Sequence, residues 1–205
     1  QSLYLKTYFP IEFMVAVINN FGGFYRTEIY VHEARMAGAN IEAPCVNQST
    51  YLTNLYGKDI YLGFIHMHSF EKKTAFAIIK EREDRGPYKD LNDFVKRVNI
   101  GREQLDLLIR IGAFRFTGLN KYELMWEKNA VYNPMIKNNG TGQLFKTEAE
   151  NYSLPALEEG PHDQAFDEIE LLGFPLSDPF ALLGTEFMGE IVASQMMAKL
   201  GRTVT

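Results

Sequence analysis

Apolar residues recur at helical spacing along most of the chain, in segments that are short and closely connected. The first segment opens at Pro10, whose fixed backbone angle suits a first helical turn, and Phe13 and Val17 share one face of it. A second helix is expected over about 26–36. Its core-facing residues would be Ile29, Ala34 and Met36.

The pattern is less regular in the next part of the chain. Residues 40–58 contain Pro44 and several turn-forming Asn, Ser and Thr residues, so we expect irregular structure with one short strand. Residues 61–65 (YLGFI) are apolar and predict a strand. The sequence therefore predicts minor β structure near residues 41–65.

A succession of short helices joined by tight turns follows. Ser69 is a candidate N-cap for a helix that continues to about Arg85, and Asp90 is a candidate cap for the next helix. Further helices are expected after the turn at 99–101, over about 120–131, and near Phe166, Ile169, Glu170 and Gly173. The predicted fold class is mainly α: short helices with a tandem helix-hairpin-helix-like region and minor β.

Composition narrows the class of protein. With 205 residues and 46% hydrophobic residues, the chain can bury the core of one large or two small domains. No apolar run approaches the roughly 20 residues that cross a bilayer, and no export signal is visible. Cys45, the lone cysteine of the sequence, fits a reducing compartment, so we expect a cytoplasmic protein without membrane contact.

Charge divides the chain into two parts. Residues 1–146 hold 19 Lys and Arg against 15 Asp and Glu, a net +4, whereas residues 147–205 hold 2 against 11, a net −9. A polyanion such as DNA would be tolerated or attracted by the first part and repelled by the second. The alternative is that the acidic surface serves solubility.

A linker is expected at residues 133–153, which include the polar run NNGTG and no periodic apolar spacing. Leu144 and Phe145 form an apolar pair within it. Such a pair can enter a pocket on a partner protein, or it can dock back on its own domain. The sequence alone leaves both readings open.

Catalytic signatures are not found in the sequence. There is no phosphate-binding loop, nucleophile elbow or paired-cysteine spacing, and adjacent acids such as Glu83 and Asp84 diverge rather than converge on one ion. His66 and His68 could ligate zinc with Cys45 or His32, but isolated histidines more often pack or face solvent, so no metal site is expected. Cys45 is expected to be a buried small hydrophobe.

The turn formed by Asn99, Ile100 and Gly101 suggests a binding site. A short helix, a tight turn and a second helix can hold one DNA phosphate on the turn amides and the second helix's N-terminus. Asn99 tolerates a positive φ, Gly101 has no side chain to block a phosphate, and Arg102 adds a positive charge. A plain helical hairpin that only packs on its neighbours is the alternative.

Eight motifs in order along the chain resemble the alpha (catalytic) subunit of bacterial DNA polymerase III. They are 4–14 (YLKTYFPIEFM), 33–38 (EARMAG), 44–47 (PCVN), 61–63 (YLG), 78–82 (IIKER), 86–94 (GPYKDLNDF), 107–114 (LLIRIGAF) and 170–177 (ELLGFPLS). An ordered series over most of the chain is far more specific than any single motif. The chain therefore resembles a piece of a much longer polymerase.

The resemblance implies a division of labour. Residues 1–60 would be the C-terminal part of the fingers, residues 61–186 a helix-hairpin-helix region that binds duplex DNA and the sliding clamp, and residues 187–205 the lead into an OB-fold. The aspartates that bind catalytic magnesium would lie upstream of Gln1 in the parent protein, which would be a nucleotidyltransferase. This fragment would then have no catalytic residue and no cofactor of its own. Its partners would be double-stranded DNA, the clamp and other replicase subunits.

Two departures from the family pattern concern the expected binding sites. The family has a hairpin resembling Ile-Lys-Gly-Val-Gly where this chain has residues 65–69 (IHMHS), so a phosphate nest is expected to be lost, with Lys72 and Lys73 giving diffuse attraction. Clamp-binding peptides resemble Gln-x-x-Leu-Phe. Here Leu144 and Phe145 match, but Thr141 stands where Gln is expected.

These observations favour a non-catalytic part of a replicative DNA polymerase that contributes DNA grip and clamp tethering. A protein-protein adaptor without DNA contact is the alternative, and it would show no salt-dependent DNA binding. A nuclease is a third class, which would require magnesium-dependent cleavage of DNA. We expect that cleavage to be absent.

Overall fold

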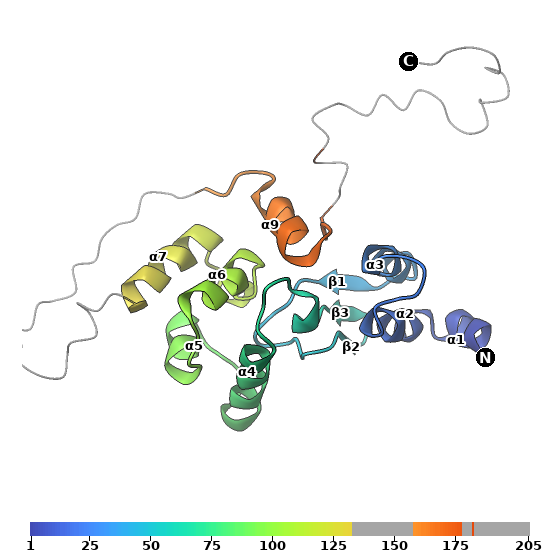
Figure 1. The fold of residues 1–205 in the computed structure, drawn as a ribbon, viewed down its shortest axis with the longest axis horizontal. Coiled ribbons are helices and arrows are strands. Elements are labelled where there is room, and N and C mark those ends of the chain that lie inside the picture. The colour runs from blue at the N-terminus through green and yellow to red at the C-terminus, as the bar shows by residue number, and fades with distance from the viewer. Residues whose placement is uncertain (133–157, 178–181, 183–205) are drawn as a thin grey trace, which may run out of the picture.

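A computed structural model describes residues 1–132, 158–177 and 182 of the chain. Within these residues, the fold consists of eight α-helices and a small mixed sheet, which confirms the predicted fold class (Figure 1). The α-helices are α1 (Ser2–Tyr8), α2 (Pro10–Asn19), α3 (Thr27–Met36), α4 (Lys72–Arg85), α5 (Leu91–Arg97), α6 (Arg102–Arg110), α7 (Lys121–Tyr132) and α9 (Asp163–Leu172). Two 3-10 helices, η1 (Phe64–His66) and η2 (Arg115–Thr117), complete the helical structure of the described part.

The sheet has three short strands, β1 (Asn40–Glu42), β2 (Asn54–Tyr56) and β3 (Asp59–Tyr61), in the order β1-β3-β2. The central strand β3 pairs in parallel with β1 and antiparallel with β2. Helices α2 and α3 lie against this sheet (Figure 1). Met14, Ala34, Ala39 and Ile60 form a small apolar cluster between these helices and the sheet.

The predicted strand over 61–65 is wrong, because the strand ends at Tyr61 and residues 64–66 form η1. Leu62 N–H still donates to the Glu42 carbonyl at 3.0 Å. Pro44 lies two residues after the end of β1, and it has no N–H to continue the pairing with β3. Gly63 then lets the chain pass tightly over residues 51–53, since a Cβ there would meet the Leu52 carbonyl carbon at 2.3 Å.

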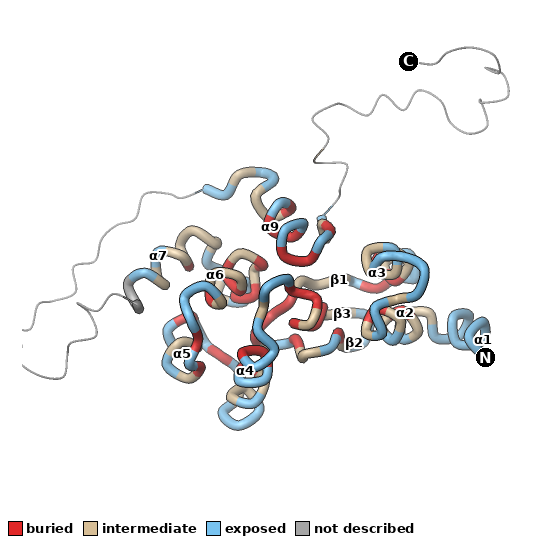
Figure 2. The backbone as a smooth tube through the Cα atoms, in the orientation of Figure 1, coloured by how far each residue is buried: buried red, intermediate tan, exposed pale blue. Residues whose placement is uncertain are grey.

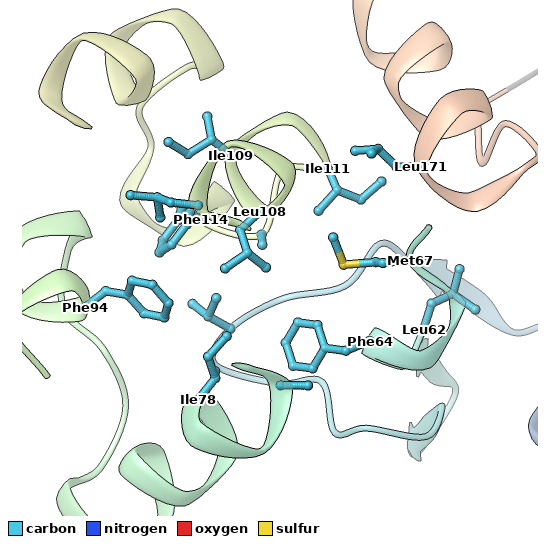
Figure 3. Close-up of a cluster of buried hydrophobic side chains, with 14 of the residues drawn as sticks. Leu62, Phe64, Met67, Ile78, Phe94, Leu108, Ile109, Ile111, Phe114 and Leu171 are labelled. Carbon is cyan, nitrogen blue, oxygen red and sulfur yellow. The ribbon is translucent and has the colours of Figure 1, made fainter. Parts of the chain in front are cut away.

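One large core unites the rest of the fold. Phe64, Ile78, Phe94, Leu108 and Phe114 are fully or almost fully buried and come from five different elements or connections (Figure 3). Phe94 meets both Tyr88 and Phe114 edge-on, with ring centroids 4.9 Å apart in each pair. Edge-to-face aromatic pairs add about 1 kcal/mol each beyond their burial. This core fixes α4, α5 and α6 relative to one another.

Several predicted helix details need correction. Helix α1 was not predicted, and none of its residues is buried, so it leaves no amphipathic signal (Figure 2). In α2 the buried residues are Met14 and Ile18, one position after the predicted Phe13 and Val17. Ile29 and Met36 of α3 face solvent rather than a core, whereas Ala34 is buried as predicted.

Helix α9 returns to the body of the fold after residues outside the described part. It packs on α6, and its inner face buries Ala165, Leu171 and Leu172 (Figures 1 and 2). Arg35 of α3 donates to the Leu176 carbonyl at 2.7 Å, so the segment after α9 also contacts the N-terminal helices. Helix α9 thus joins the first and last described parts of the chain.

Candidate nucleic-acid interface

The hairpin between α5 and α6 is held firmly on the core. Asp90 caps α5 as predicted, and its carboxylate accepts from the Asp93 N–H at 2.7 Å. Phe94, Val98 and Ile100 are buried beneath the hairpin, and Leu105 continues the buried row into α6. The apolar residues point inward, so the polar residues of the turn are left at the surface.

The turn presents the predicted residues to solvent, because Asn99, Gly101 and Arg102 are all exposed. Gly101 is the N-cap of α6, has φ −74° and ψ 155°, and offers no side chain to accept from the first-turn amides. A Cβ at Gly101 would meet nothing within 4 Å, and residues 101–103 are all exposed. The first turn of α6 is therefore accessible to an anion.

Asn99 tolerates a positive φ but does not adopt one. Among the described residues, the non-glycine positions with positive φ are Phe21 and Ser69. Val98, the C-cap of α5, and Gly101 are both extended, so the turn needs no left-handed residue. Gly101 contributes open space rather than conformational freedom.

Ser69 adopts the left-handed conformation, with φ 61°. The resemblance described above would align Ser69 with the second glycine of the family's hairpin. The predicted N-cap role of Ser69 is wrong, since α4 begins at Lys72 with Glu71 as its N-cap. The backbone of this first hairpin keeps a turn that glycine would favour, although the chain has no glycine in residues 65–69.

Gln104 joins the two hairpins. Its Oε1 accepts from the Glu71 N–H at 2.8 Å, and its Nε2 donates to the Ser69 carbonyl at 3.0 Å. The Gln104 side-chain amide therefore accepts one hydrogen bond from the backbone of the loop before α4 and donates another to it. Because Gln104 belongs to the first turn of α6, the N-termini of α4 and α6 are held side by side. Sequence reasoning missed this residue, which no motif marks.

Lys72 and Lys73 lie at the start of α4, and both are exposed. The Lys73 ammonium is 3.8 Å from the Glu71 carboxylate, an exposed pair that solvent weakens. Lys96, near the end of α5, is a further exposed cation that was not predicted. Cations therefore lie on α4 and α5 as well as at Arg102.

Two charged residues near the hairpin do not favour phosphate binding. Glu103 is exposed in the first turn of α6, where its carboxylate would repel a phosphate. Arg97 donates to the Glu81 and Gly86 carbonyls at 2.8 and 2.7 Å, and its side chain is 10% exposed. Arg97 therefore fixes the connection between α4 and α5 rather than offering charge to a ligand.

An ion network holds the acidic helix α9 against the hairpin region. Asp167 accepts from Arg110 Nε at 2.7 Å and from Lys121 Nζ at 2.6 Å, and Arg110 also contacts Glu170. Hydrogen bonds to Glu170 and Asp167 raise the pKa of the Arg110 guanidinium, and the Arg110 contact lowers the pKa of Glu170. Part of the negative charge of the C-terminal region is thus neutralised within the fold.

The first hairpin also contacts α9 through His68. Its backbone N–H donates to the Leu171 carbonyl at 2.7 Å, and its Nδ1 lies 3.1 Å from the Glu170 carbonyl oxygen. The loop before α4 is therefore supported on one side by α9 and on the other by Gln104. This double support explains how Ser69 is kept in its strained conformation.

The histidines do not assemble a metal site. His66 is buried, and burial lowers its pKa to about 4, whereas His68 is exposed and bound to α9. Cys45 is a buried free thiol, as predicted. Across residues 1–132 and 158–177, no three His, Cys, Asp or Glu side chains gather closely enough to hold a metal ion.

Two further predictions from the sequence concern the clamp and the membrane. Leu144 and Phe145 lie outside the described residues, so their predicted clamp contact stays a prediction. No helix in the described part of the chain is long and apolar enough to cross a membrane.

The sequence is similar to those of several known proteins. Residues 38–124 match a family described as the helix-hairpin-helix motif. The chain is 28% identical over 184 residues to the DNA polymerase III subunit alpha of Thermus aquaticus, an alignment that covers 85% of this chain and 14% of that protein. Identity to the Staphylococcus epidermidis RP62A subunit alpha is 30% over 179 residues, with 85% and 17% covered. An error-prone DNA polymerase of Vibrio campbellii is 25% identical over 177 residues, with 78% and 17% covered.

The matched segment is a small part of each relative, since the chain spans 14 to 17% of the length of these three proteins. The motif match includes the sheet, both hairpin loops and the start of α7. The chain is therefore homologous, over most of its length, to a segment of the bacterial DNA polymerase III alpha subunit that contains a helix-hairpin-helix motif.

Proposed function

We propose that this chain is a non-catalytic part of a cytoplasmic replicative DNA polymerase, in which it binds duplex DNA and tethers the polymerase to its sliding clamp. The observation that carries the DNA-binding proposal is the open first turn of α6 behind Gly101, held beside the start of α4 by Gln104. Backbone amides at such a turn bind a phosphate without reading sequence. The site suits a protein that must slide along its product.

Charge placement supports the same proposal. Exposed cations lie in the first turns of the two helices, at Lys72 and Lys73 of α4 and at Arg102 of α6. Lys96, near the end of α5, is also exposed. Much of the opposing acidic charge on α9 is paired with Arg110 and Lys121. A phosphate backbone would therefore meet a locally basic surface although the whole chain carries a net charge of −5.

The test is duplex binding by the 205-residue chain, measured by fluorescence anisotropy at several salt concentrations. If the chain contacts several phosphates, affinity falls steeply between low and physiological salt, with a log–log slope of about −0.9 per contacted phosphate. No salt-dependent binding would favour the protein-protein adaptor instead.

A series of substitutions at Gly101 separates the contributions to binding. Gly101→Ala is expected to bind nearly as the parent does, because its Cβ points into open space and φ is −74°. Gly101→Asn places a cap on the amides, and Gly101→Asp adds a negative charge, so affinity should fall in the order Ala, Asn, Asp, by about tenfold at Asp. Both caps favour α6, so a loss of folding cannot explain weaker binding. Equal affinities would return residues 99–101 to the plain-hairpin interpretation.

Clamp tethering is tested at Leu144 and Phe145. Replacing both with Ala should abolish capture of the sliding clamp without changing the unfolding temperature, because the apolar pair is proposed to enter a clamp pocket. Thr141→Gln restores the family pattern and should strengthen capture. Retained capture by the double variant would mean that another segment binds the clamp.

A further inference from the structure

An exposed group of one cation and two aromatic rings lies beside the first turn of α4. The rings of Tyr51 and Phe76 are stacked, with centroids 5.1 Å apart and an interplanar angle of 27°. Lys72 Nζ lies 5.2 Å from the Tyr51 centroid and 5.9 Å from the Phe76 centroid. We call these three residues the α4 aromatic patch.

The two rings of the patch differ in burial, because Tyr51 packs against the large core and Phe76 does not. Phe76 is 49% exposed and Tyr51 is partly exposed, and Phe76 is absent from both buried clusters of the described residues. Helix α4 is firmly seated without Phe76, because Thr74, Ala75 and Ile78 form its buried face. A large ring kept on the outward face of a helix is therefore not explained by packing of that helix.

Positive charge brackets the ring along the helix. Lys72 and Lys73 lie one turn before Phe76, and Lys80 lies one turn after it on the same exposed face. Within the helix, the exposed acidic residues Glu83 and Asp84 come only in the later turns, although Glu71, the exposed N-cap, lies 3.8 Å from the Lys73 ammonium. The first two turns thus combine an aromatic surface with flanking cations.

This combination matches the chemistry of an unpaired nucleotide. A base has a π-face that stacks on an aromatic ring, and its phosphates pair with nearby lysines. A base inside a duplex has both faces covered by its neighbours and cannot stack on the patch. An acidic peptide would satisfy the lysines but would leave the rings without a planar partner.

We propose that the α4 aromatic patch binds an unpaired nucleotide of single-stranded DNA, with its base stacked on the Phe76 ring, whose other face Tyr51 covers, and its phosphates near Lys72, Lys73 and Lys80. This inference shares the nucleic-acid setting of the proposed function and its residues Lys72 and Lys73, but it concerns a different ligand and adds the Phe76 and Tyr51 rings, which the duplex proposal does not use. The patch would hold a displaced or frayed strand next to the bound duplex.

The test compares two labelled single strands of about 12 nucleotides, one of thymidines and one abasic, with the same number of phosphates. Both are titrated into the 205-residue chain by fluorescence anisotropy. We expect the thymidine strand to bind about tenfold more tightly, which corresponds to one stacked base. Equal affinity for the two strands, or no binding to either, would overturn the proposal.

Variants then locate the effect. Phe76→Ala should remove the preference for bases while leaving duplex binding unchanged, and Phe76→Leu should do the same while keeping apolar volume on α4. Phe24→Ala is the matched control, because Phe24 is a fully exposed aromatic residue on the loop between α2 and α3. It should bind as the parent does. A base preference that survives both Phe76 variants would overturn the proposal.

The outcome is separable from that of the proposed function. If Gly101→Asp weakens duplex binding but the Phe76 variants leave single-strand binding unchanged, only the proposal for the α4 aromatic patch is overturned. If the chain does not bind duplex DNA but shows a base preference that the Phe76 variants remove, only the duplex proposal is overturned.

Discussion

Gln104 gives the sharpest test of how the two hairpins cooperate. Its amide makes two hydrogen bonds to the loop before α4, at 2.8 and 3.0 Å, and each is worth about 0.5 to 1.5 kcal/mol net. Gln104→Ala should therefore lower the free energy of unfolding by about 1 to 2 kcal/mol. The loop that contains Ser69 would also lose the support that holds its left-handed backbone.

The effect on DNA is predicted separately from the effect on stability. If both helix N-termini contact one DNA backbone, releasing the loop removes about one phosphate contact, so duplex affinity should fall by about tenfold and the salt slope should decrease by about one. Gln104→Glu keeps the acceptor for Glu71 N–H but loses the donor to Ser69 and adds a charge, so it should bind duplex still more weakly.

The assay is anisotropy at three or more salt concentrations, with urea unfolding of the same samples. Asn92→Ala, which removes an exposed amide from α5, is the control and should change neither quantity. The reasoning would be refuted if Gln104→Ala lost the expected stability but kept the affinity and the salt slope of the parent chain. The pairing of the two hairpins would then be purely structural.

Three further predictions concern the elements that support the site. Burial lowers the pKa of His66 to about 4, so on acidification the imidazole of the unfolded chain is protonated before that of the folded chain. The free energy of unfolding should therefore be highest above pH 6.5 and fall by up to about 3 kcal/mol as the pH drops towards 4. His66→Gln should flatten that dependence in urea unfolding at stepped pH, and an unchanged slope would exclude His66 as its source. Ser69→Gly relieves a left-handed residue and should raise stability by about 1 kcal/mol in the same assay; a loss would show that the Ser69 conformation is not strained. Asp167→Ala leaves Arg110 and Lys121 without a shared carboxylate and should cost about 3 kcal/mol, whereas the exposed Asp84→Ala should cost little. If both variants lost a similar amount of unfolding free energy, the α9 ion network would not stabilise the fold more than an exposed carboxylate does.

Local signals explain what the sequence could predict. Proline and glycine punctuation with helical spacing located α2 to α7 and α9, and the cap at Asp90 was found because a side-chain cap is a local feature. The exposed Asn99, Gly101 and Arg102 were also predictable, since the apolar residues around them fill one face and leave the turn outside. Whether they bind DNA stays a prediction.

Features that depend on distant contacts could not be predicted. Gln104 has its role because the loop of Ser69 and Glu71 lies beside it, which no spacing in the sequence reveals. The end of β3 depends on Pro44 in the neighbouring strand's continuation and on the tight passage at Gly63. The ion pairs of α9 likewise join residues 46 to 60 positions apart.

The central claim is that duplex DNA sits on the adjoining N-termini of α6 and α4. The most direct measurement is a titration of the isotopically labelled chain with a short duplex, following the backbone amides by two-dimensional NMR. The account predicts that the largest shifts fall on the amides of residues 101–104 and 71–73. Shifts confined to other surfaces, with these amides unmoved at saturation, would contradict it.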